Sequence, residues 1–95
     1  MSHFIGTLIV ELHIPQAHSL KEKRSVVKSV IARTREKFNV SVAEVDYHDM
    51  WQRAEIAVAV VSGSHTEVDR MLETILIFIQ SSFSGDLISV NKEVL

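Results

Sequence analysis

The motif Ser-x-x-Glu occurs twice in the chain, each time between an apolar segment and a run with helical periodicity. The two copies begin at Ser19 and Ser64, with Glu22 and Glu67 three residues further on. In such a capping box the serine hydroxyl accepts a hydrogen bond from the backbone N–H of the glutamate, and the glutamate side chain reaches back to the serine N–H. The sequence therefore predicts two helices, each preceded and followed by a strand.

The apolar segments around these motifs predict four strands. The first, residues 4–14, alternates an apolar face with a face that becomes polar near its end. Residues 39–45 and 54–61 show the same period of two, and residues 87–94 follow the stop that Gly85 supplies. The order strand-helix-strand-strand-helix-strand predicts an α+β, ferredoxin-like fold, in which a four-stranded antiparallel sheet carries two helices on one face and the first and third strands are central.

The length and composition predict one domain that spans residues 1–95. The chain has one Pro, three Gly and no Cys, so disulfides, thiolate metal sites and cysteine nucleophiles are excluded. It lacks both an apolar run of about 18 residues and a signal-peptide pattern, so we expect no membrane association. We expect a cytoplasmic protein without a cofactor or a bound metal ion.

The first predicted helix, residues 19–38, carries most of the positive charge. Lys21, Arg24, Lys28 and Arg35 fall within about 60° of one another on the helix, away from the apolar stripe. Such a basic stripe is either a solvated helix face or a surface that contacts a phosphate backbone or an acidic protein. The net charge of −2 excludes a protein that coats nucleic acid through its overall charge. The apolar stripe contains Leu20, Val27, Val30, Ile31, Thr34 and Phe38.

Other polar residues near the start of this helix have two interpretations each. Lys23 falls inside the apolar arc, so its ammonium either reaches water along an aliphatic stem or is buried in a pocket. His13 and His18 flank Pro15 in the preceding loop. Histidines near a helix N-terminus can bind an anion, although exposed loop histidines are commoner.

One face of the predicted sheet is left uncovered by the helices, and its residues are mostly apolar. Contiguous apolar surface commonly marks an interaction site, so we expect a homodimer or another protein complex through this face. Ala43 and Val45 extend the surface, and the alternative is a modest apolar face partly covered by Trp51, Tyr47 or the chain ends. The central strands carry no aromatic residues there, which argues against base stacking on the sheet in the manner of an RNA recognition motif. The expected interface residues are Ile5, Thr7, Ile9, Ala57, Ala59 and Val61.

Several chemically able side chains gather in residues 46–53. His48, Asp49 and Arg53 are candidates for binding a small ligand or moving a proton. No H-E-x-x-H, P-loop, G-x-S-x-G or cysteine pair accompanies them, so no catalytic residue is assigned. The alternative is a turn in which Trp51 packs at the rim and Arg53 pairs with a carboxylate.

Three stretches carry a resemblance to a known family: VELHIPQAHSLKEKRSVVKS, FNVSVAEVD and WQRAEIAVAVVS. Together they resemble the bacterial YlxP-like family of small proteins of unknown function. The resemblance covers essentially the whole chain and implies a ferredoxin-like fold. No activity is established for the family, so it supplies no catalytic residues. Its genes often lie near those for a transcription elongation factor, a translation initiation factor and a ribosome-binding factor, which implies a role near RNA or the ribosome.

Three functions therefore remain open. The first is a non-enzymatic accessory protein that contacts ribosomal RNA or a ribosomal protein through the basic first helix. The second is a self-associating protein interaction module that uses the open sheet face. The third is a small-ligand sensor or an enzyme that uses residues 46–53. Composition alone favours the second, and the family resemblance favours the first.

Overall fold

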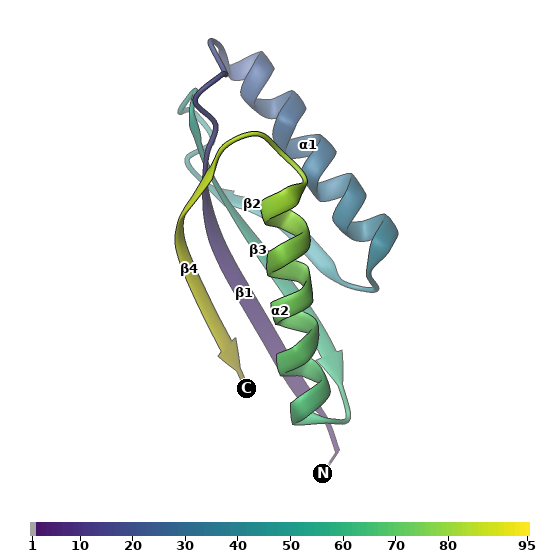
Figure 1. Cartoon of the computed structure of the whole chain (residues 1–95). Coiled ribbons are helices and arrows are strands. Elements are labelled where there is room, and N and C mark those ends of the chain that lie inside the picture. Colours follow the sequence, from purple (N-terminus) through teal and green to yellow (C-terminus); the bar gives the residue numbers. More distant parts are fainter. Residues whose placement is uncertain (1) are drawn as a thin grey trace.

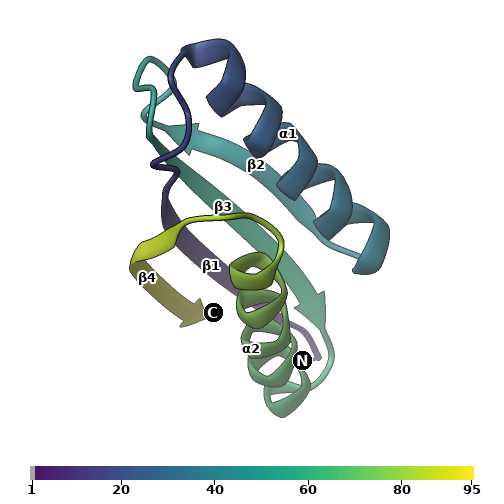
Figure 2. The ribbon, with the colours of Figure 1, turned by 45° about the horizontal axis from the view of Figure 1, so that its top comes forward.

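The computed structural model describes residues 2–95 and has the predicted order of elements (Figure 1). All four strands form one antiparallel sheet in the order β2-β3-β1-β4, and both helices lie on the same face of it (Figures 1 and 2). The ferredoxin-like prediction is confirmed, including the central position of the first and third strands. The elements are β1 (Phe4–His13), α1 (Leu20–Lys37), β2 (Ser41–Asp46), β3 (Arg53–Ser62), α2 (His65–Ser81) and β4 (Asp86–Val94).

Both helices begin at the predicted serines. Ser19 Oγ accepts from the backbone N–H of Glu22 at 3.1 Å, and Ser64 Oγ accepts from that of Glu67 at 3.2 Å. The prediction that each glutamate side chain reaches back to the N–H of the capping serine is wrong in both helices. Glu22 Oε1 accepts instead from the backbone N–H of His18 at 2.6 Å. The Glu67 carboxylate accepts from Arg70, one turn further along α2, because a guanidinium offers a charge-assisted bond.

The core lies between the helices and one face of the sheet. β1 and β3 bury their alternate residues there, and α2 buries Val68, Leu72, Ile75 and Ile79 at helical spacing. Gly6 lets α2 approach β1 closely, since a Cβ there would lie 2.4 Å from Val68 Cγ1. Ile77, between these buried positions of α2, is exposed.

The strand boundaries differ from the prediction by a few residues. β1 ends at His13, since the N–H of Ile14 bonds to Gln52 O at 2.8 Å outside the ladder. β2 is 41–46 instead of 39–45, and α2 ends at Ser81, four residues before Gly85. Among residues 2–95, no helix is both long enough and apolar enough to span a membrane.

The edge strand β4 is tied to α2 by ion pairs. Lys92 Nζ lies 3.0 Å from Glu73 Oε2 and 3.3 Å from Asp69 Oδ1. These hydrogen bonds, first to Glu73 and then to Asp69, raise the pKa of Lys92. The groups are exposed, so the pairs orient the strand more than they stabilise it.

Candidate functional site

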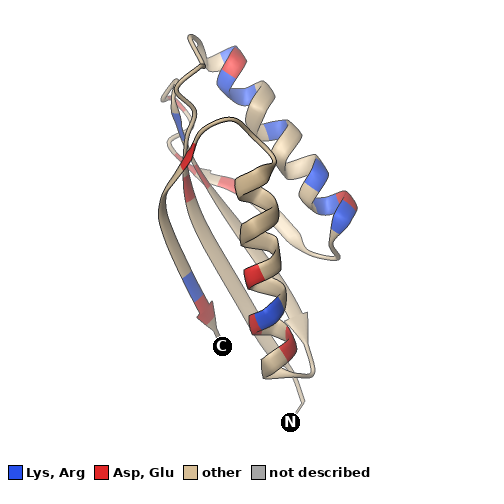
Figure 3. Cartoon of the chain, in the orientation of Figure 1, with Lys and Arg blue, Asp and Glu red and all other residues tan. Residues whose placement is uncertain are grey.

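Charge is unevenly distributed over the molecule, and the positive charge is concentrated on α1 (Figure 3). This helix carries seven Lys and Arg residues and two Glu residues, a net charge of +5. Because the whole chain carries −2, the remaining residues carry −7. An anionic partner is therefore attracted to α1 and repelled by the rest of the molecule.

Three of the four predicted stripe residues surround one hollow on α1. Lys21, Arg24 and Lys28 are exposed, and together with Ser25 they line a hollow of about 380 Å³. Within residues 2–95 none of these three cations forms a hydrogen bond or an ion pair. We call Lys21, Arg24 and Lys28 the basic face. Its charges are free to meet a ligand without breaking an internal contact.

Arg35, the fourth stripe residue, is placed differently. Its Nη2 donates to the carbonyl oxygen of Val42 at 2.8 Å. Since β2 is an edge strand, this bond satisfies a carbonyl of the edge strand. Arg35 lines no part of the hollow that the other three residues share.

Lys23 is fully buried, which confirms the second interpretation of its place in the apolar arc. Its Nζ donates to Glu44 Oε2 at 2.9 Å, to Tyr47 O at 3.0 Å and to His48 O at 3.3 Å. All three ammonium protons thus have acceptors. Glu44 faces the helices because it lies two residues after the buried Val42 on the same face of β2. Lys23 therefore fastens the first turn of α1 to the loop that follows β2.

The polar end of the open sheet face is organised by an ion pair. Glu11 is only 7% exposed and accepts from Arg53 Nε at 2.6 Å. The hydrogen bond that Arg53 donates to the Glu11 carboxylate raises the pKa of Arg53. The guanidinium also lies over the ring of Tyr47, 4.3 Å from its centroid. The predicted alternative, in which Arg53 pairs with a carboxylate, is confirmed.

Of the predicted ligand candidates His48, Asp49 and Arg53, Arg53 lines a hollow beside the loop between β2 and β3. His48 and Asp49 are exposed, and the structural contribution of His48 is its carbonyl oxygen. Among residues 2–95, no group of three or more His, Asp and Glu side chains is placed to hold a metal ion.

The hollow that Arg53 lines has a volume of about 390 Å³ and lies at the loop between β2 and β3. The Trp51 side chain is 57% exposed there, and Met50 is also exposed. Sequence reasoning did not assign His13 to this place, although antiparallel pairing of β1 and β3 sets it opposite Arg53. We call this the loop hollow. Its lining residues are His13, Met50, Trp51, Gln52 and Arg53.

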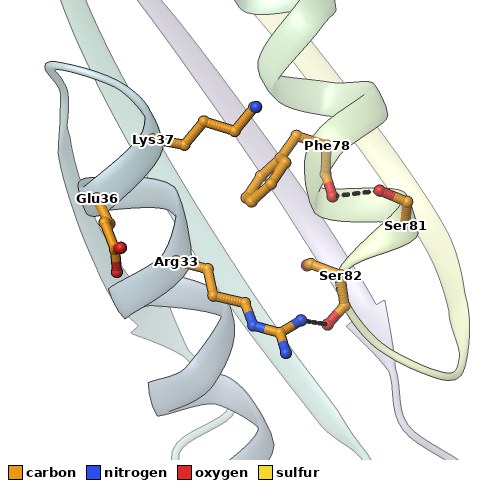
Figure 4. Close-up of a pocket in the computed structure, with 6 residues that line it drawn as sticks. All are labelled: Arg33, Glu36, Lys37, Phe78, Ser81 and Ser82. Atoms are coloured by element: carbon orange, nitrogen blue, oxygen red, sulfur yellow. Dashed lines mark hydrogen bonds between the residues drawn. The ribbon is translucent and has the colours of Figure 1, made fainter.

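A larger cleft of about 620 Å³ lies between the C-terminal parts of the two helices (Figure 4). Arg33 Nη1 donates to Ser82 O at 3.2 Å, and Lys37 Nζ lies 5.6 Å from the centroid of the Phe78 ring. Phe38 contacts the same ring edge to face. These cations are engaged with α2, so they contribute to helix packing. The cleft is lined by Arg33, Glu36, Lys37, Phe78, Ser81 and Ser82.

The apolar half of the open sheet face remains exposed. Ile5, Ile9 and Val61 are exposed, and Val61 retains 65% of its surface. Tyr47 lies over Arg53 at the polar end, where it does not cover these residues. The chain end contributes Leu95, whose backbone exchanges two hydrogen bonds with Ile5. Thr7, Ala57 and Ala59 are half-buried between them.

Comparison with known proteins identifies the family. A family model described as "Protein of unknown function (DUF503)" matches residues 5–92. The chain belongs to this family. The uncharacterized protein YlxP of Bacillus subtilis (strain 168) is 44% identical over 77 residues, which cover 81% of this chain and 84% of that protein. The predicted YlxP-like membership is confirmed.

Solved structures similar to this family member share its fold at low identity. The de novo designed protein Foldit4 has a TM-score of 0.58 and 14% identity, covering 98% of this chain and 96% of its own. The designed protein LFR1 1, described as having a ferredoxin fold, has a TM-score of 0.55 and 12% identity, with 96% and 83% covered. A C-terminal segment of the aIF2 alpha subunit from Pyrococcus abyssi has a TM-score of 0.51 and 14% identity. The match covers 96% of this chain and 49% of that one. These similarities establish the architecture alone.

Proposed function

We propose that the chain is a non-enzymatic accessory protein that binds RNA at or near the ribosome through the basic face of α1. The observation that carries the proposal is that Lys21, Arg24 and Lys28 are exposed and unpaired around one hollow. Residues 21 and 28 are about 10 Å apart along the helix axis. That span covers more than one phosphate of a nucleic acid strand.

The neighbouring contacts of α1 support the same proposal. Glu22, the acidic residue within this segment, has one carboxylate oxygen bonded to the N–H of His18. The buried Lys23 ammonium pairs with the Glu44 carboxylate, so that carboxylate does not compete with RNA for the basic face. The resemblance to proteins whose genes lie near those of translation factors supports the ribosome as the setting.

The experiment measures binding of the chain to small ribosomal subunits and to ribosomal RNA across a salt series. The variant Lys21→Gln/Arg24→Gln/Lys28→Gln removes the basic face. The matched control, Arg33→Gln/Arg35→Gln/Lys37→Gln, removes the same charge from the same helix outside the hollow. Log affinity falls linearly with log salt concentration, and each phosphate contact contributes about 0.7 to 0.9 to the steepness of that fall. We therefore expect the first variant to make the fall shallower by about 2 to 3.

The control variant should keep most of its affinity. Equal weakening in the two variants would contradict a site on the basic face. Absence of wild-type binding at low salt would overturn the proposal.

A second candidate function is self-association through the open sheet face. The exposed Ile5, Ile9 and Val61, on two adjacent central strands, support it. A contact of this kind is driven by apolar burial, so it should respond little to salt. The two functions use opposite faces of the sheet and are compatible with each other.

A further inference from the structure

We propose that the RNA bound by the basic face is single-stranded, and that one of its bases stacks on Trp51 in the loop hollow. This inference rests on the proposed RNA binding by α1 and adds the kind of RNA and a second contact. Lys21, Arg24 and Lys28 would hold phosphates, and the loop hollow would hold an unpaired base.

The chemistry of the loop hollow suits a base. Trp51 leaves more than half of its surface in water beside the exposed Met50. Unpaired RNA bases bind by stacking on aromatic rings and guanidinium planes. The two basic side chains in the hollow already have carboxylate neighbours, because Arg53 is bonded to Glu11 and His13 Nδ1 lies 3.6 Å from Asp86 Oδ2. The hollow therefore favours an uncharged aromatic group over a phosphate.

The loop hollow and the basic face are held at the same end of the molecule. Figures 1 and 2 both place the loop between β2 and β3 beside the start of α1. Lys23, between Lys21 and Arg24 in sequence, donates to the carbonyl oxygens of Tyr47 and His48 in that loop. In the segment before α1, the carbonyl oxygens of Pro15 and Ala17 accept from Gln52 Nε2 at 3.0 and 3.1 Å. The spacing of the two contacts is thus set before RNA binds, which reduces the ordering cost.

The basic face and the loop hollow lie on different layers of the fold, and this geometry favours single-stranded RNA over a duplex. α1 covers one face of the sheet, whereas His13 and Arg53 belong to the open face. An RNA that reaches both must turn around the end of the molecule. A duplex is stiff, and its bases are stacked inside, whereas a single strand bends and its bases can be splayed out.

The test uses the fluorescence of Trp51, which is the chain's only tryptophan. The full chain is titrated with a single-stranded RNA oligonucleotide and with a duplex RNA carrying the same number of phosphates. We expect the single strand to bind more tightly and to quench the fluorescence, and the duplex to leave it unchanged. Trp51→Ala should weaken single-strand binding roughly 5- to 150-fold. Trp51→Phe keeps an aromatic face and should retain most of the affinity.

The outcomes separate this inference from the proposed function. Equal affinity for both RNAs, unaffected by Trp51→Ala but lost in Lys21→Gln/Arg24→Gln/Lys28→Gln, would overturn the inference and leave RNA binding by α1 intact. Quenching by the single strand that persists in that triple variant at higher RNA concentration would support stacking even without the basic face. If neither RNA binds the wild-type chain, both proposals fail.

Discussion

Lys23 places a charged ammonium where the helical pattern calls for an apolar residue. Glu44 and two loop carbonyl oxygens surround it. Burying a charge costs several kcal/mol, so such a pair adds little net stability over a well-packed apolar residue. What it adds is position, because the same nitrogen joins a helix, a strand and a loop.

Replacing Lys23 by Met tests this role. We expect Lys23→Met to lower the free energy of unfolding by about 3 to 5 kcal/mol, because the largely buried Glu44 loses its partner. Urea denaturation followed by circular dichroism measures the change. Lys21→Met, at the exposed neighbouring position, should change stability by no more than about 0.5 kcal/mol.

A second substitution distinguishes an unpaired charge from lost packing. Lys23→Met/Glu44→Leu should recover much of the loss, since neither charge remains. If Lys23→Met costs no more than Lys21→Met, the ammonium does not hold the loop.

At the scale of elements, the packing of α2 on β1 depends on one glycine. At Gly6 a Cβ would lie 2.4 Å from Val68 Cγ1 and 2.9 Å from Leu72 Cδ1, and both of these side chains are fully buried. Packed helices and sheets do not absorb an added methyl group without a shift. The position therefore fixes how closely α2 approaches the sheet.

Gly6→Ala should lower the free energy of unfolding by about 1 to 3 kcal/mol through overpacking. Gly63→Ala is the comparison, because a Cβ there meets only Ser2 O at 3.2 Å. In the Gly6→Ala background, Val68→Ala should cost less than it does in the wild type, since it makes room for the new methyl group. Chemical denaturation of the wild type, Gly6→Ala, Val68→Ala and the double variant measures the coupling. Strictly additive losses of stability would contradict a clash between residues 6 and 68.

At the scale of the whole molecule, the two layers present different surfaces. The helix layer carries the basic face, and the open side of the sheet carries an apolar half and a polar end. A small domain buries only about 60% of its unfolded surface, so association through the apolar half would add burial that the monomer lacks.

Self-association predicts a dimer that a charge on the central strands disrupts. We expect Ile9→Lys to give monomers in sedimentation velocity, because an ammonium cannot be buried unpaired in an apolar contact. Ile77→Lys is the matched control: its side chain is 62% exposed on α2, so the dimer should persist. The wild-type dimer should withstand high salt. A wild-type chain that sediments as a monomer would overturn this second candidate function.

The sequence by itself determined the order of elements, the two helix starts and the buried faces. These follow from local chemistry, since a serine three residues before a glutamate caps a helix and alternation of apolar residues sets the buried side of a strand. The basic stripe was readable for the same reason, because residues at helical spacing share a face in any helix.

Only the tertiary structure decided how the polar residues combine. In the folded chain Arg35 donates to Val42 O, the buried Lys23 pairs with Glu44, and His13 lines the same hollow as Trp51. Each of these contacts joins different elements, so its partners depend on strand register and on where the helices lie on the sheet. Local periodicity carries no information about such long-range pairings. The loop hollow could therefore be identified only from the tertiary structure, in which β1 lies beside β3 and the loop before it.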